Sequence, residues 1–279
     1  MIRLRALPIL ALLLLPGNLV ANDASGTFHF GKTTFKIANA VAYQRDGDDP
    51  KKLVTVILAA DFTLDVAAIV AAIDPTNALV QQVARNERGN FVRVTLAAPD
   101  RCGIWAFLDT GNQVELSDTF PAKTAASSAT RIAGECSTSK PEKTLFGDEY
   151  DFHLAYNLPI TPIARPVSLA AGGGEPGHAF VALIVAIRAG DWEGSRLHLR
   201  QDEAPKTKPA PSETTHFFEG LALNYPKSAT VTGGLIKGGE AQLQIAGTTY
   251  EGKKIKGDIA MKNIAGNWRV ADMSLYGDE

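Results

Sequence analysis

The stretch GHAFVALIVAIRAGDWEG, residues 177–194, carries the clearest information about the fold. Ten of its first thirteen residues are apolar, and the run then ends at Gly190. A bilayer-spanning helix needs about twenty apolar residues, so this run is too short to be a membrane segment. Only His178 and Arg188 in the run are ionisable, which disfavours the wall of an active site. Because the helix is apolar on all sides, we expect it to be wrapped by a curved sheet.

The residues after this helix support that interpretation. Helical patterns cover residues 192–202 and 212–226, the latter with Ser212 as its N-cap and Pro226 as its stop. Four strand patterns follow in a row, over residues 228–236, 239–250, 253–263 and 267–276, with glycine turns between most of them. Helices followed by an antiparallel meander are typical of an α+β domain.

The first part of the chain, about residues 26–158, has mostly strand patterns. Residues 65–74 form the exception, with helical composition and Asp65 as a capping residue. The predicted fold class is therefore α+β. The N-terminal domain is expected to be mainly antiparallel β with one small helix, and the C-terminal domain to consist of helices wrapped by a curved antiparallel sheet.

The sequence begins with the layout of a secretory signal peptide. Arg3 and Arg5 precede an apolar run from Ala6 to Leu15, and the small residue Ala21 follows. The alternative is a membrane anchor, but the run is too short for one. We expect cleavage after residue 21, a periplasmic or secreted protein, and no membrane span after cleavage.

Composition shifts divide the remaining chain. Residues 159–176 carry four prolines and three consecutive glycines, which suits a connector better than a packed element. The predicted units are thus a signal peptide (1–21), a mainly-β domain (22–158), a linker (159–176) and a cone-like α+β domain (177–279).

Cys102 and Cys136 are the chain's two cysteines. In an oxidising compartment an even pair is most simply one disulfide, which would be worth about 4 kcal/mol on the chain-entropy model. Two buried free thiols are the alternative. Two cysteines with no histidine near either one do not form a structural zinc site, and we predict no metal and no cofactor.

The C-terminal part resembles the nuclear transport factor 2-like (cystatin-like cone) superfamily, in its secreted bacterial form. The resemblance rests on Ala189-Gly190-Asp191 at the helix end, the strand at residues 239–247, and Trp268-Arg269-Val270 in the last strand. It extends from Glu175 to the end and implies a fold more than an activity. The N-terminal part is similar to uncharacterised secreted bacterial β-domains, which implies no function.

Enzymes of that superfamily place acids, histidines or tyrosines inside the cone, so the resemblance directs attention to four candidate residues for a ligand pocket. Solvent-facing histidines and packed tyrosines are the commoner alternatives. No nucleophile, metalloprotease or phosphate-loop motif occurs in the sequence, so we predict that the protein is not an enzyme. The candidates are His178, His216, Tyr225 and Trp268.

Charge excludes some classes of partner. Removing the signal peptide changes the balance of Lys and Arg against Asp and Glu from 28 against 30 to 26 against 30, or −4. This balance gives no field for capturing nucleic acid. We predict an exported, non-enzymatic binding protein of unknown partner, in one version an inhibitor of the immunity type. The alternative is a small-ligand-binding protein that uses the cone pocket, and a cone-fold hydrolase or isomerase ranks third. The sequence leaves the oligomeric state open.

Overall fold

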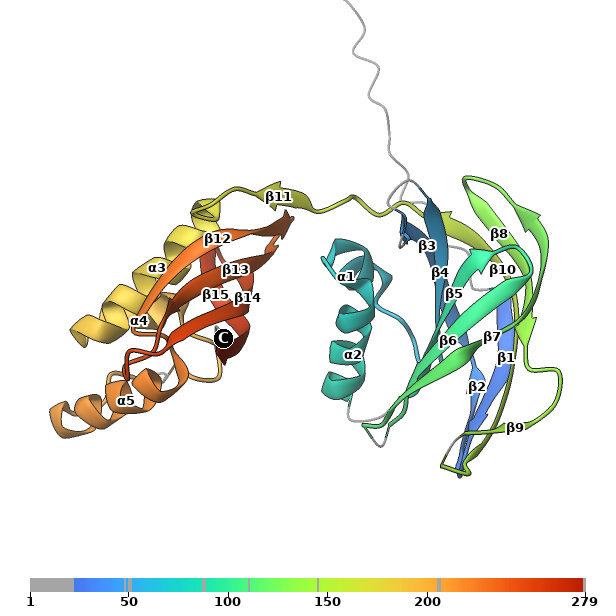
Figure 1. The fold of residues 1–279 in the computed structure, drawn as a ribbon, viewed down its shortest axis with the longest axis horizontal. Helices are drawn as coiled ribbons and strands as arrows, with labels where there is room; N and C mark the ends of the chain where they lie inside the picture. The colour runs from blue at the N-terminus through green and yellow to red at the C-terminus, as the bar shows by residue number, and fades with distance from the viewer. Residues whose placement is uncertain are drawn as a thin grey trace, which may run out of the picture.

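The computed structural model describes residues 23–277 apart from residues 48, 50, 51, 87, 88, 110, 145, 205 and 206. The predicted signal peptide lies outside the described residues. The protein is mainly β, with 51% of the described residues in strands and 22% in helices, and its strands form two separate sheets (Figure 1). The α+β prediction is therefore wrong. Among the described residues, no helix has both the length and the apolar character that a membrane crossing requires.

The first sheet has ten strands and carries two helices on its outside. Its elements, in chain order, are β1 (Asp23–Phe30), β2 (Thr33–Ile37), β3 (Asn39–Asp46), β4 (Leu53–Ala60), α1 (Val66–Ala71), α2 (Pro75–Asn86), β5 (Phe91–Ala98), β6 (Arg101–Phe107), β7 (Gln113–Ser127), β8 (Arg131–Ser137), β9 (Glu142–Lys143) and β10 (Glu149–Thr161).

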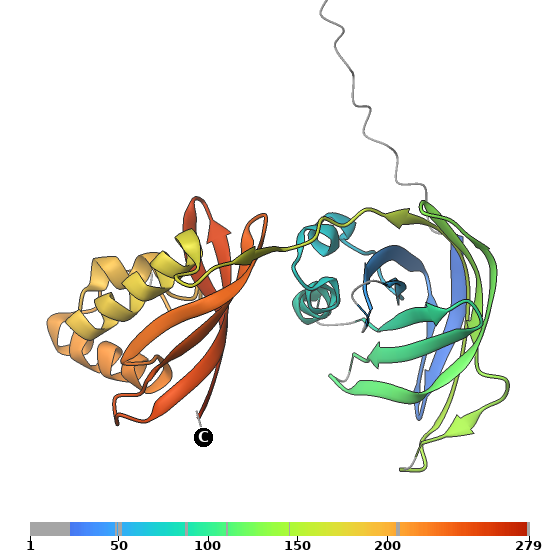
Figure 2. The same ribbon diagram turned by 45° about the horizontal axis from the view of Figure 1, so that its top comes forward.

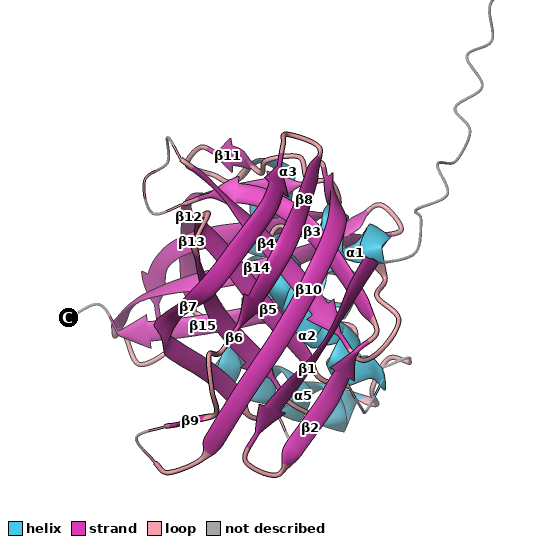
Figure 3. Cartoon of the chain, turned by 90° about the vertical axis from the view of Figure 1, so that its right-hand side faces the viewer, coloured by secondary structure: helices cyan, strands magenta, loops and turns pink. Residues whose placement is uncertain are grey.

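Strand β10 closes this sheet into a seven-stranded barrel. It pairs with β8 along one side, and at its end Ile160 and Thr161 pair in parallel with Ala42 and Tyr43 of β3. The first part of β10 pairs instead with β1, and β2 extends β1 as a hairpin. Figure 3 shows β7, β8, β10 and β1 running obliquely side by side. A strand of 13 residues is long enough to serve these different neighbours.

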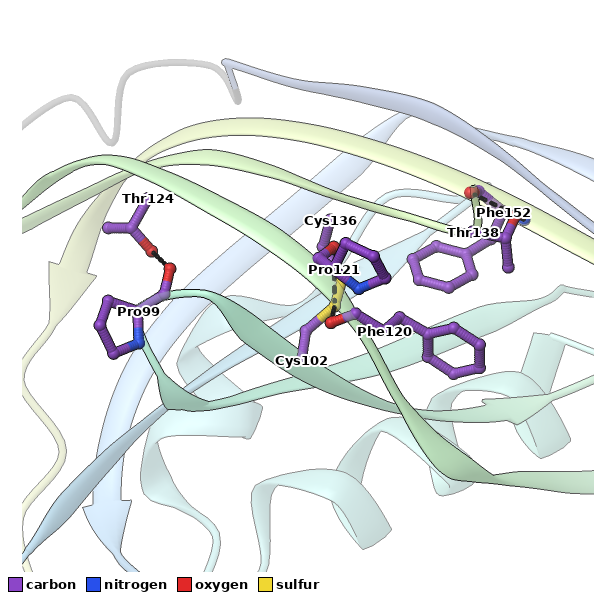
Figure 4. Close-up of a disulfide and its surroundings, with 8 residues drawn as sticks. All are labelled: Pro99, Cys102, Phe120, Pro121, Thr124, Cys136, Thr138 and Phe152. Carbon is purple, nitrogen blue, oxygen red and sulfur yellow. Dashed lines mark hydrogen bonds between the residues drawn. A yellow bond between two sulfur atoms is a disulfide. The ribbon is translucent and has the colours of Figure 1, made fainter. Parts of the chain in front are cut away.

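Side chains fill the barrel interior, as expected for a barrel of this size. Phe28 and Phe152 are buried there, and the ring of Phe120 meets that of Phe152 edge to face, with centroids 5.2 Å apart. Cys102 on β6 and Cys136 on β8 form a disulfide inside the barrel, with 6.5 Å between their Cα atoms (Figure 4). The disulfide prediction is confirmed, and the bond links the two strands that flank β7.

Helices α1 and α2 cover the outer face of β3, β4 and β5. The Asp65 side chain accepts a hydrogen bond from the backbone N–H of Ala68, which begins α1 as the sequence predicts. The chain then turns into α2, whose Leu79 and Val83 are buried against the barrel. The prediction of one small helix is wrong, because the structure has two helices here. The spacing of Leu79 and Val83, four positions apart, is the sequence signal of the second one.

The second sheet has five strands in the order β11-β12-β13-β14-β15. Its elements and the accompanying helices are β11 (Val167–Leu169), α3 (Gly174–Ala189), α4 (Trp192–His198), α5 (Pro211–Asn224), β12 (Ser228–Lys237), β13 (Glu240–Thr248), β14 (Lys254–Ile264) and β15 (Asn267–Gly277). Strand β11 lies within the predicted linker and pairs with β12. Helix α5 begins at Pro211 with Ala210 as its N-cap, so the Ser212 cap prediction is wrong.

Helix α3 ends as its sequence predicts. Gly190 takes the left-handed conformation, with φ 66°, and its N–H donates to the carbonyl oxygen of Ile187. Asp191 then caps α4 by accepting from the N–H of Gly194.

The expectation that a curved sheet wraps these helices is wrong, because α3, α4 and α5 lie on one face of the sheet (Figure 2). The buried side chains of α3 include Phe180, Leu183, Ile184 and Ile187, which form one stripe with helical spacing. Val185, off that stripe, is 49% exposed. Helix α3 is therefore apolar on all sides but is buried on only one of them.

Candidate functional site

A cavity of about 590 Å³ lies where the barrel, the connecting chain and the second sheet meet. Its lining comes from the ends of β3 and β10, the start of β4, Arg93 of β5, the junction of α1 and α2, the turn between β7 and β8, the connecting residues 162–166 and Lys237 of β12. Small-molecule sites typically measure about 300–1,000 Å³, so the cavity has the size of such a site.

The walls of the cavity combine apolar and charged side chains. Ile73, Ile160 and Ile163 are among the apolar residues of the lining, and Ile163 also packs against the cluster beneath α1 and α2. Of the charged lining residues two are acidic, Asp46 and Asp74, and four are basic, Arg45, Arg93, Arg165 and Lys237.

Both acidic side chains are already engaged. An Asp46 carboxylate oxygen lies 2.8 Å from Nη2 of Arg165, which ties the connecting chain to the end of β3. The Asp74 carboxylate accepts hydrogen bonds from the backbone N–H groups of Thr76 and Asn77, at 2.8 and 3.2 Å, and so caps α2. The acids of the cavity thus hold the fold together at this point.

Lys237 is the most deeply buried cation of the cavity, with 8% of its surface exposed. Its ammonium donates to the carbonyl oxygen of Ala72 at 2.6 Å. Burial lowers its pKa, and the nearby Glu240 carboxylate opposes that shift. Among the described residues no carboxylate forms an ion pair with this ammonium. Lys237 is therefore a buried residue whose ammonium is only partly satisfied by the described residues.

The turn between β12 and β13, which follows Lys237, makes a second contact with the barrel region. Glu240 Oε2 accepts a hydrogen bond from the backbone N–H of Ile73 at 3.1 Å, and Oε1 lies 3.3 Å from the ammonium of Lys262. Lys237 and Glu240 thus attach the turn between β12 and β13 to the junction of α1 and α2. This attachment forms one end of the cavity.

Tyr43 and Arg93 lie on the barrel side of the cavity. Burial raises the pKa of the Tyr43 phenol, while a hydrogen bond with Thr76 opposes the shift. The Arg93 guanidinium lies 5.1 Å from the ring centroid of Trp105, a cation–π arrangement that restrains the side chain. The wall here offers a neutral phenol and an oriented cation.

No known family, curated protein or solved structure matches this chain. The resemblance of the C-terminal region to the nuclear transport factor 2-like superfamily stays a prediction. The site is accordingly interpreted from its own residues.

The two histidines predicted as pocket candidates are exposed. His178 lies in the first turns of α3, and His216 lies on α5 with its Nδ1 3.0 Å from a carboxylate oxygen of Glu219. Neither residue lines the cavity.

The other two candidates belong to the apolar core between the helices and the second sheet. The Tyr225 hydroxyl donates to Glu203 Oε2 at 2.7 Å, and its pKa is raised by burial first and by that hydrogen bond second. Within the described part of the chain, the buried indole nitrogen of Trp268 has no hydrogen-bond partner. Neither of these two residues lines the cavity either.

The sequence interpretation missed the residues that do line it. Arg45 and Arg93 come from separate strands of the barrel, and Lys237 comes from the other sheet. No motif connects them. The one local signal is the position of Lys237, which follows the apolar residues Leu235 and Ile236 and precedes the glycine turn.

Proposed function

We propose that the protein is an exported, non-enzymatic binding protein that holds a small ligand in the cavity between the barrel and the second sheet. The observation that carries this proposal is the cavity of about 590 Å³, whose walls combine apolar side chains with polar and charged ones. In small-molecule sites of this size, apolar contact supplies affinity and polar groups fix the orientation of the ligand.

The chemistry of the charged groups favours binding over catalysis. Guanidinium groups do not give up a proton in proteins, so Arg45 and Arg93 serve as permanent cations. Asp46 and Asp74 are committed to an ion pair and a helix cap. The cavity therefore supplies groups that attract and orient a ligand rather than a matched acid and base.

Two features support export. The disulfide between Cys102 and Cys136 is of the kind that persists in oxidising compartments. The first residues of the chain have the charge and apolar pattern of a signal peptide. We infer that the protein is periplasmic or secreted.

A thermal-shift panel of small metabolites tests the function. We expect at least one compound to raise the melting temperature of the wild-type protein and of Ala170→Trp, whose exposed residue lies outside the cavity. The same compound should leave the melting temperature of Ala164→Trp unchanged. Ala164 lines the cavity, so the indole of the variant would occupy the space that the ligand needs. If no compound acts, or if both variants respond equally, the proposal is wrong.

A protein partner is the second candidate, in one version a toxin inhibited by this protein. It is favoured by large apolar side chains that remain exposed on the helices beside the second sheet. Val185 on α3 is 49% exposed and Leu223 on α5 is 88% exposed. Recovery of one specific partner from periplasmic extract, lost with Val185→Ser and Leu223→Ser, would support this candidate, and repeated recovery of none would contradict it.

A further inference from the structure

The cavity has an excess of positive charge on a chain whose overall charge is slightly negative. Asp46 is paired with Arg165, and the Asp74 carboxylate accepts hydrogen bonds from the first backbone N–H groups of α2, so four basic residues of the lining stand against two acids whose contacts are already made. Among the described residues, the cations Arg45, Arg93 and Lys237 are left without a carboxylate in an ion pair. The local field therefore favours an anion.

Lys237 gives this excess a specific position. An ammonium has three N–H donors, and the carbonyl of Ala72 accepts from one of them. Lys237 is a buried residue, and holding its ammonium with one hydrogen-bond acceptor among the described residues costs free energy, part of which an anion beside it would offset. Charge-assisted hydrogen bonds of this kind are among the stronger ones in proteins.

The remaining walls define the rest of the ligand. Leu53, Ile73, Ile160 and Ile163 contribute apolar surface, and Pro75 and Pro166 add rigid apolar rings. A bare inorganic ion would leave this surface in contact with water, whereas a compound with a hydrocarbon body would cover it.

We propose that the ligand is a small organic anion with an apolar body, whose acid group is held by Lys237 together with Arg93 or Arg45. The acid group is a carboxylate or a phosphate ester, since both suit an ammonium and a guanidinium. This inference rests on the proposed small-ligand function.

A matched pair of fluorescent dyes tests the charge. 1-Anilinonaphthalene-8-sulfonate carries the aromatic body and an anionic group, and N-phenyl-1-naphthylamine carries the same body without it. We expect the sulfonate to bind the full mature chain at least tenfold more tightly, with an affinity that falls as salt is added. Displacement of the dye by 1-naphthoate, 1-naphthyl phosphate and neutral 1-naphthamide distinguishes a carboxylate from a phosphate ligand.

Variants then assign the site. Lys237→Met keeps the aliphatic stem and should weaken sulfonate binding by roughly tenfold without changing binding of the neutral dye. Arg93→Met provides a second variant on the other wall and should act in the same direction. Lys36→Met, an exposed lysine of β2 outside the cavity, is the matched control and should leave both affinities unchanged.

The outcomes separate the two proposals. If the wild-type protein binds the sulfonate dye more tightly than the neutral dye, and if Lys237→Met and Ala164→Trp abolish this preference, both the anionic ligand and the small-ligand function are supported. A second outcome is that the two dyes bind equally well, that Ala164→Trp blocks this binding, and that Lys237→Met does not change it. This result would refute the proposal of an anionic ligand and retain the proposed small-ligand function. Failure of both dyes, all three naphthyl compounds and the metabolite panel overturns the function itself.

Discussion

Strands β3, β4 and β5 of the barrel are covered on both faces, whereas the second sheet is covered only on the face beneath α3, α4 and α5. The sequences of two strands show the difference. In β4 every residue from Val56 to Ala60 is fully buried, and this segment is a continuous apolar run. In β13 the buried residues Leu243 and Ile245 alternate with the exposed Gln242 and Gln244. Continuous and alternating patterns thus distinguish strands covered on two faces from strands covered on one.

The two regions also differ in how their edges are treated. Each of the seven barrel strands has neighbours on both sides, and a disulfide links β6 to β8. The second sheet is open, and both cysteines lie in the barrel. We expect the barrel to be the more stable region, and four measurements test that expectation, from the largest expected effect to the smallest.

Phe180→Ala should destabilise the second region selectively. The side chain is fully buried between α3 and the sheet, so its loss leaves a cavity and costs about 3–5 kcal/mol. Hydrogen exchange followed by mass spectrometry should show faster exchange in β12–β14 and unchanged exchange in β4–β6. Val185→Ala, which removes a half-exposed side chain, is the control. Equal acceleration in the barrel would mean that the two regions unfold as one.

Replacing both cysteines by alanine should destabilise the barrel selectively. The bond closes a loop with a sequence separation of 34 residues, and its loss is expected to cost about 2–4 kcal/mol. Urea unfolding measures the loss, and exchange in β6 and β8 locates it. Treatment of the wild-type protein with reductant should reproduce the result. An unchanged urea midpoint would contradict a stabilising role for the disulfide.

Glu240→Ala should weaken the coupling between the regions. It removes the acceptor of the Ile73 N–H, which is worth about 1 kcal/mol. The unfolding transition should broaden or separate into two, as measured by urea titration. Glu251→Ala removes an exposed carboxylate paired with Lys253, away from the barrel, and should change nothing. The same response from both variants would refute the coupling.

Alkaline pH should weaken the second region through Tyr225. Because folding raises the pKa of this phenol, the unfolded chain loses the proton above about pH 10 while the folded chain keeps it. Its contribution to stability is complete below that pH and declines as the pH rises, by at most about 1.4 kcal/mol per pH unit. The stability difference between wild type and Tyr225→Phe should therefore shrink between pH 10 and 11. A stability difference that stays constant or grows over this range would contradict the prediction.

Local features of the fold were predictable because their causes are local. The cap at Gly190, the caps by Asp65 and Asp191, and the alternation of Ala241, Leu243 and Ile245 all depend on residues a few positions apart. The cysteine pair was predictable from count and compartment.

Closure of the barrel was not predictable, because it depends on pairing between Ile160 and Ala42, far apart in the sequence. The side of a helix that is buried is equally non-local, since Val185 is half exposed because the sheet packs against the opposite side of α3. The cavity combines both difficulties. Arg45, Arg93 and Lys237 come from β3, β5 and β12, and only the meeting of the two regions brings them to one lining.

The attachment of the β12–β13 turn has a consequence for sequence drift. Lys237 binds the carbonyl of Ala72, and Glu240 binds the N–H of Ile73, so both side chains address main-chain atoms. Any residue that preserves the backbone path at 72 and 73 keeps these bonds, with the exception of proline at 73, which has no N–H. In related chains we expect positions 237 and 240 to be retained. The side chains at 72 and 73 are constrained by other contacts, Ala72 by its burial and Ile73 by the cavity wall, so pairwise covariation would not reveal this junction.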